Sequence, residues 1–218
     1  MYSLTAVTDS REHEGYRLPF PDFIKVHLRR SKTPTLIKIA REVDTMPAGD
    51  YTLKGFENVV LVETKRSARE VRENLLTPDF RRSSRAFDNL GMCRNPILAC
   101  EFGQSELLCG EYGSPELVDH FAAAVARHNL RVWFCGPRSD VAARRRTAEV
   151  LLRLMIACVE LECPNFLHGS LLNDENVPGK MDSGNEGVKR RRCRQPRGRH
   201  TRVQRHSRTR PRTRCRHH

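Results

Sequence analysis

Val59-Val60-Leu61-Val62-Glu63-Thr64-Lys65 has the strongest β-strand pattern in the chain, because four aliphatic residues are followed by a charged end. Alternate side chains of a strand lie on one face, so Glu63 and Lys65 point the same way from that end. Upstream, Pro47-Ala48-Gly49-Asp50 has the composition of a turn, after which a short strand is expected to begin. Pairing of the two strands would bring the carboxylates of Asp50 and Glu63 together with the ammonium group of Lys65.

Two carboxylates beside an ammonium group suit a divalent metal ion. Carboxylate oxygens are ligands of hard cations such as Mg²⁺, which keeps several waters for chemistry, and the carbonyl of Thr64 is a further candidate ligand. Lys65 would position or activate a water, or offset charge on a phosphorane-like transition state. The same pattern also arises by chance, in which case Glu63 and Lys65 are a solvated strand end and Asp50 is a turn residue.

The rest of the chain predicts an α/β fold with one central sheet covered by helices on both faces. Strands are expected at 5–9, 35–43, 51–53, 59–65, 96–102 and 130–135, the early ones as a meander. Capping residues predict helices that begin after Ser67, Thr77, Ser114 and Asp140. The segment 16–31 contains two prolines, and its apolar residues follow neither a helical nor a strand period.

We expect three parts: a domain over 1–160, a flexible linker over 161–187, and a tail over 188–218 that its charge sets apart. All 26 acidic residues lie in residues 1–187 with 25 Lys and Arg, whereas the last 31 residues contain 14 basic residues and no acid. This uneven distribution of charge excludes a nucleic-acid coat protein that is basic over its whole length. The tail is expected to be disordered alone and to bind polyanions in a salt-dependent way. Read-through from an altered reading frame would give the same composition.

Cysteine usage and hydropathy predict an intracellular protein that does not enter a membrane. None of the eight cysteines forms a CxxC pair, and several lie in apolar settings, which favours buried reduced thiols. Residues 1–10 are mixed, polar and acidic, so no signal peptide is predicted. The apolar stretches are shorter than the roughly 18 residues that a membrane span needs.

The order of the motifs resembles the nuclease domain of XPF-type excision-repair endonucleases, which belong to the PD-(D/E)xK superfamily. The resemblance rests on Asp9-Ser10-Arg11-Glu12, on Gly49-Asp50-Tyr51 and on Glu63-Thr64-Lys65, and it covers about residues 5–158. It implies a restriction-endonuclease-like fold with a central mixed sheet. It also implies a metal-dependent endonuclease that hydrolyses DNA phosphodiester bonds, at branched or junction DNA in repair or recombination.

The resemblance also implies roles for individual residues. Asp50 and Glu63 would bind Mg²⁺ or Mn²⁺, Asp9 would be a further acid near the metal, and Lys65 would be the catalytic lysine. By the resemblance Arg11 would touch a phosphate. Apart from the resemblance, Arg66, Arg69, Arg81 and Arg82 belong to basic stripes beside the proposed site and are also expected to bind DNA phosphates. The alternatives are an ion pair of Arg11 with Glu12 and, for the other arginines, a solvated helix face.

Two positions depart from the family pattern: Thr64 stands where the family has arginine, and Arg69 where it has aspartate. Glu70 is assigned to a capping box with Ser67 rather than to catalysis. These departures support a rival interpretation, a non-catalytic nucleic-acid-binding protein of the same fold. A third is an interaction protein with a basic tail and an accidental motif. We expect no paired helix-hairpin-helix module of the family within these 218 residues, so the body, the tail, a homodimer or a partner subunit would select the substrate.

Overall fold

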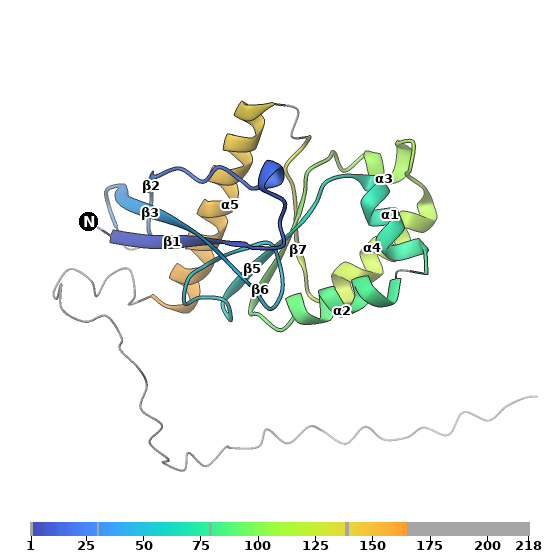
Figure 1. Ribbon diagram of the computed structural model, residues 1–218, viewed down its shortest axis with the longest axis horizontal. Helices are drawn as coiled ribbons and strands as arrows, with labels where there is room; N and C mark the ends of the chain where they lie inside the picture. The colour runs from blue at the N-terminus through green and yellow to red at the C-terminus, as the bar shows by residue number, and fades with distance from the viewer. Residues whose placement is uncertain (1, 30, 79, 138–139, 165–218) are drawn as a thin grey trace, which may run out of the picture. The chain divides into compact units, whose positions relative to one another are not determined.

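The computed structural model describes residues 2–29, 31–78, 80–137 and 140–164, which form a mixed sheet with helices on both faces (Figure 1). The strands are β1 (Tyr2–Asp9), β2 (Phe23–Val26), β3 (Thr35–Asp44), β4 (Tyr51–Leu53), β5 (Val60–Lys65), β6 (Asn95–Cys100) and β7 (Arg131–Phe134). The helices are a 3₁₀ turn (Glu14–Tyr16), α1 (Ala68–Leu76), α2 (Phe80–Leu90), α3 (Glu106–Cys109), α4 (Pro115–Arg127) and α5 (Val141–Glu162). The expected α/β class is confirmed. The tail, and the linker from residue 165 on, lie outside the described residues.

The strand order is β2-β3-β1-β4-β5-β6-β7, and β1 runs parallel to β3 but antiparallel to β4. The expected meander of the early strands is therefore wrong. The reason is β2, which pairs antiparallel with β3 at the sheet edge and returns the chain alongside β1. In β2, buried Ile24 and Val26 alternate with exposed Phe23 and Lys25. Four alternating residues after Pro19 and Pro21 are too few to be recognised as a strand from the sequence.

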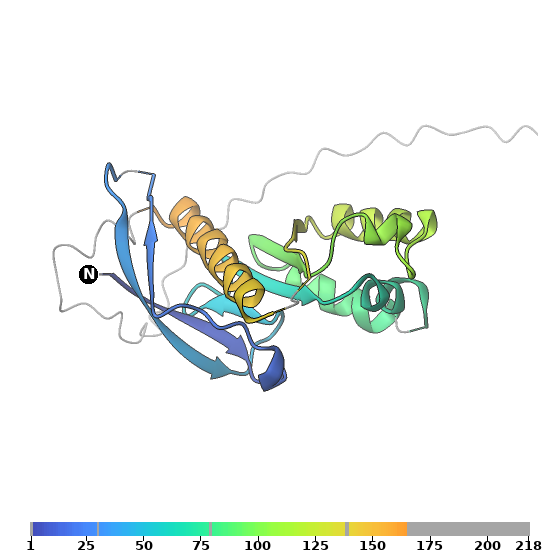
Figure 2. The same cartoon turned by 90° about the horizontal axis from the view of Figure 1, so that it is seen from above.

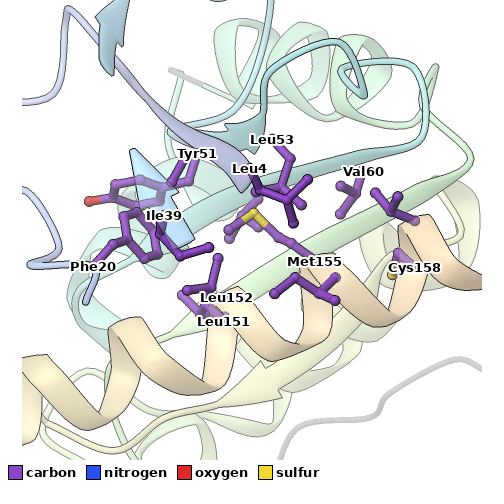
Figure 3. Close-up of a cluster of buried hydrophobic side chains, with 14 of the residues drawn as sticks. Leu4, Phe20, Ile39, Tyr51, Leu53, Val60, Leu151, Leu152, Met155 and Cys158 are labelled. Atoms are coloured by element: carbon purple, nitrogen blue, oxygen red, sulfur yellow. The ribbon is translucent and has the colours of Figure 1, made fainter. Parts of the chain in front are cut away.

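Helix α5 covers one face of the sheet, as Figure 2 shows from above. Leu151, Leu152 and Met155 of this helix are fully buried. They belong to one hydrophobic cluster with strand residues such as Leu53 and Val60 (Figure 3). Burying a side chain of this size stabilises the fold by about 1.5–3 kcal/mol, so this helix anchors the strands that carry the candidate site.

Helices α1, α2 and α4 cover the opposite face. Val71, Phe87 and Leu117 from these helices form a second hydrophobic cluster with Leu61 of β5. Strand β5 is thus packed on both faces, because Val60 and Val62 belong to the α5 cluster. Its three aliphatic residues after Val59 are almost fully buried, and Glu63 is the first of its side chains to be partly exposed.

The predicted capping residues begin three of the helices. The side chains of Ser67, Ser114 and Asp140 each accept a hydrogen bond from the backbone N–H three residues later in the chain. The distances are 3.1, 3.1 and 2.7 Å. Each bond satisfies one of the backbone donors that the first turn of a helix leaves unpaired. Helix α5 continues to Glu162, so it extends two residues into the segment expected to be linker.

The six cysteines in the described residues are free thiols. Cys93, Cys100 and Cys158 are buried as expected, and burial raises the pKa of Cys100 to about 12. Cys109 is exposed, which corrects the general expectation of burial. In the part of the chain that the structure describes, no helix is long and apolar enough to cross a membrane.

Candidate active site

Three neighbouring inner strands bring the predicted acidic residues together at one end of the strands. Asp9 ends β1, Asp50 precedes β4, and Glu63 lies near the end of β5. The N–H of Asp9 donates to the carbonyl of Asp50 at 2.8 Å, and the N–H of Asp50 donates to the carbonyl of Val62 at 2.7 Å. The main chain of Asp50 is therefore held from both sides.

These acids face a cavity of about 320 Å³. The lining comes from the three strand ends, from the turn before β4 and from one side of α2. It consists of Asp9, Arg11, Glu12, Pro47, Ala48, Gly49, Asp50, Glu63, Ala86 and Asn89. The prediction that Asp50 and Glu63 converge is thus met by the geometry.

The carboxylate of Asp50 is held by Thr64. Both the N–H and the hydroxyl group of Thr64 donate to Oδ2 of Asp50, at 2.8 and 2.6 Å. Among the hydrogen bonds of the described residues, none involves Oδ1 of Asp50. One oxygen of this carboxylate is therefore fixed and the other remains available to a ligand.

Glu63 and Lys65 form a buried ion pair, with 2.8 Å between Oε1 and Nζ. Their side chains are 18% and 8% exposed, which lowers screening by water. Burial raises the pKa of Glu63, Lys65 lowers it and Asp50 raises it again, and the net shift is upward. Burial disfavours the charge of Lys65, but Glu63 and Glu70 outweigh burial, so the pKa of Lys65 is raised. Lys65 is therefore a cation at neutral pH and is suited to stabilise negative charge.

Asp9 lines the same cavity, but Arg11 occupies its carboxylate. The guanidinium Nε and Nη2 of Arg11 donate to the two carboxylate oxygens at 2.9 and 2.6 Å. Burial opposes ionisation of Asp9, but these bonds outweigh it and the pKa of Asp9 is lowered. The alternative pairing of Arg11 with Glu12 is wrong, because Arg11 bonds to Asp9.

Glu12 instead pairs with Arg66, 54 residues further along the chain. The Nη2 group of Arg66 lies 2.8 and 2.9 Å from the two carboxylate oxygens of Glu12. The same guanidinium stacks 3.9 Å from the ring centroid of Tyr16. Arg66 therefore ties the loop after β1 to the end of β5, and its predicted phosphate contact would compete with these bonds.

The other arginines of the predicted phosphate-binding set lie on α1 and α2. Arg69 is exposed and pairs with Glu73 at 2.8 Å. Arg81 is exposed on α2, and the side chain of Arg82 lies outside the described part of the structure. Exposed guanidinium groups fit both phosphate binding and a solvated helix face.

Sequence reasoning missed three contributions to this site. Glu70 was assigned to a cap, and Ser67 does accept its N–H, but its carboxylate also lies 3.3 Å from Nζ of Lys65 and accepts the N–H of Arg66. Ala86 and Asn89 line the cavity from α2. Ala86 and Asn89 are three residues apart and therefore lie on one side of α2, next to the buried residues Phe87 and Leu90. This helical spacing is the signal that could have indicated them.

The residues present fit a hydrated divalent cation rather than a closed protein cage. In the described residues, no group of three or more His, Cys, Asp or Glu side chains is assembled for a metal. Mg²⁺ is usually bound through one or two carboxylates and keeps several waters, which matches Asp50 and Glu63. The charge of Asp50 raises the pKa of Glu63, and a cation between the two carboxylates would relieve this repulsion.

Gly49 sets the approach of Asp50 to β5, which gives a testable prediction. Its φ is +74°, and a Cβ at this position would lie 2.9 Å from the carbonyl oxygen of Val62, the acceptor for Asp50. We expect Gly49→Ala to lower the free energy of unfolding by about 2–3 kcal/mol, measured in urea. Gly55→Ala is the matched control, since φ is +81° there with nothing within 4 Å. Equal losses for the two variants would show that the contact with Val62 costs nothing.

The solved structures that are similar to this chain include two of XPF. XPF from Aeropyrum pernix in complex with DNA is 15% identical, with a TM-score of 0.45 over 70% of this chain and 65% of that chain. XPF from Aeropyrum pernix is 16% identical, with a TM-score of 0.45 over 84% of this chain and 69% of that chain. No family model matches the sequence, and no curated protein does. Both are similarities of fold.

Proposed function

We propose that this chain is a metal-dependent endonuclease that hydrolyses DNA phosphodiester bonds. The observation that carries the proposal is the convergence of Asp50 and Glu63 on one cavity, with Lys65 paired to Glu63 beside it. The XPF-type resemblance of the motifs that contain these residues suggests branched or junction DNA as the substrate, in repair or recombination. It also suggests a homodimer or a partner subunit, and an intracellular, DNA-associated enzyme.

In this mechanism Asp50 and Glu63 would hold Mg²⁺ or Mn²⁺, which when bound supplies a Lewis acid and a water of lowered pKa. Thr64 keeps one oxygen of Asp50 occupied and leaves the other for the metal. Lys65, charged at neutral pH, would stabilise the negative charge that develops on the phosphate oxygens in the transition state. Ala86 and Asn89 of helix α2 also line the cavity and would exclude water from part of it.

The proposal is tested with full-length protein on labelled flap, splayed-arm and linear DNAs, each with Mg²⁺, Mn²⁺ or a chelator. We expect cleavage with either metal, none with the chelator, and a preference for the branched substrates. Cleavage that persists in the chelator would rule out the metal mechanism.

The second candidate is a non-catalytic nucleic-acid-binding protein of the same fold. It is favoured by the occupied carboxylate of Asp9, whose oxygens both accept bonds from Arg11. DNA binding without cleavage under every metal condition would identify it. The third interpretation, an accidental motif, would have been favoured by carboxylates that lie apart, whereas Asp50 and Glu63 line one cavity.

A further inference from the structure

Thr64 lies between the two charged residues of β5 and makes two hydrogen bonds to a neighbouring strand end. Its N–H and Oγ1 lie 2.8 and 2.6 Å from Oδ2 of Asp50. The residue is 5% exposed. A hydroxyl bond of this length to an anionic carboxylate is in the range of charge-assisted hydrogen bonds, which are about twice as strong as neutral ones.

The other bonds of Asp50 fix its backbone but not its side chain. Its N–H is held by Val62 and its carbonyl by Asp9. The remaining freedom is rotation of the carboxylate about its side-chain torsions. Thr64 supplies the two bonds that oppose this rotation, and both reach the same oxygen.

We propose that Thr64 is a positioning residue, which holds the Asp50 carboxylate with Oδ1 directed to the metal. This inference rests on the proposed function, because it assigns the free oxygen to a metal ion. Hydrogen-bond partners of metal ligands orient those ligands, and their removal typically costs 10–100-fold in metal affinity. Any residue except proline keeps the backbone N–H at position 64, so loss of the hydroxyl alone should weaken metal affinity by the lower end of this range, about tenfold.

The test compares three variants of the full-length chain. Thr64→Val keeps the β-branched shape and loses the hydroxyl, Thr64→Ala loses it without adding a methyl against the carboxylate, and Thr64→Ser keeps it. Mn²⁺ affinity is measured without DNA, from the electron paramagnetic resonance signal of free Mn²⁺. The Mn²⁺ concentration for half-maximal DNA cleavage is measured separately, and thermal unfolding in chelator confirms that each variant is folded.

We expect Thr64→Val and Thr64→Ala to bind Mn²⁺ about tenfold more weakly, and Thr64→Ser to stay within about threefold of the unmodified chain. The cleavage rate at saturating Mn²⁺ should recover in all three variants. Two results would overturn the inference alone: unchanged Mn²⁺ affinity in the variants without the hydroxyl, or an equal loss in Thr64→Ser. An unmodified chain that binds no Mn²⁺ would overturn the proposed function, and the inference with it.

Discussion

Asp50→Asn and Glu63→Gln are each expected to lower metal-dependent DNA cleavage by on the order of 100- to 1,000-fold, because each removes one anionic ligand from the cavity. The fold should persist in both variants. An asparagine can present its carbonyl oxygen to the two donors of Thr64, as Oδ2 of Asp50 does. In Glu63→Gln, Lys65 keeps Glu70 as a charged neighbour, at 3.3 Å.

The measurement is the single-turnover cleavage rate on a branched DNA at saturating Mg²⁺, with far-ultraviolet circular dichroism as the check on folding. Asp22→Asn and Glu149→Gln are the matched controls. They make the same changes of charge at exposed carboxylates that pair with Arg41 and Arg153, outside the cavity. Cleavage that is undiminished in Asp50→Asn and Glu63→Gln would overturn the assignment of the active site.

The parts of the fold that sequence predicts are those that depend on local interactions. The run of aliphatic residues in β5 and the caps at Ser67, Ser114 and Asp140 act within a few residues, so these elements form where they were expected. The order of strands is a tertiary property. The parallel pairing of β1 with β3 depends on the edge strand β2, whose four residues carry a weak pattern.

The candidate site divides in the same way. Convergence of Asp50 with Glu63 follows from a turn and an antiparallel pair, both of which are readable from spacing. The partners of the arginines are not readable, because an ion pair between Glu12 and Arg66 joins residues 54 positions apart. The hydrogen bond from the hydroxyl group of Thr64 to Asp50 is also not predictable from the sequence. It depends on the carboxylate of Asp50 extending beyond the last paired residues of β4 and β5.

Removal of residues 188–218 is expected to weaken DNA binding strongly and to flatten its dependence on salt. Residues 1–187 carry a formal charge of −1 and the tail carries +14, so most of the general attraction to DNA should come from the tail. Each phosphate neutralised on duplex DNA adds about −0.9 to the slope of log affinity against log salt. If the tail neutralises half as many phosphates as it has basic residues, its loss removes a slope of about −6.

The experiment measures affinity for one labelled duplex between low and physiological salt, for the full chain and for a chain that ends at Gly187. A full-length chain with residues 188–218 in scrambled order is the control, because it keeps the charge and should bind as the natural order does. The shortened chain should still cleave at saturating DNA, since the proposed metal ligands Asp50 and Glu63 lie in the part that remains. Equal affinity and equal slope after removal would mean that the tail is not a DNA-binding arm, which favours read-through as its origin. Loss of turnover at saturating DNA would instead place part of the active site in residues 188–218.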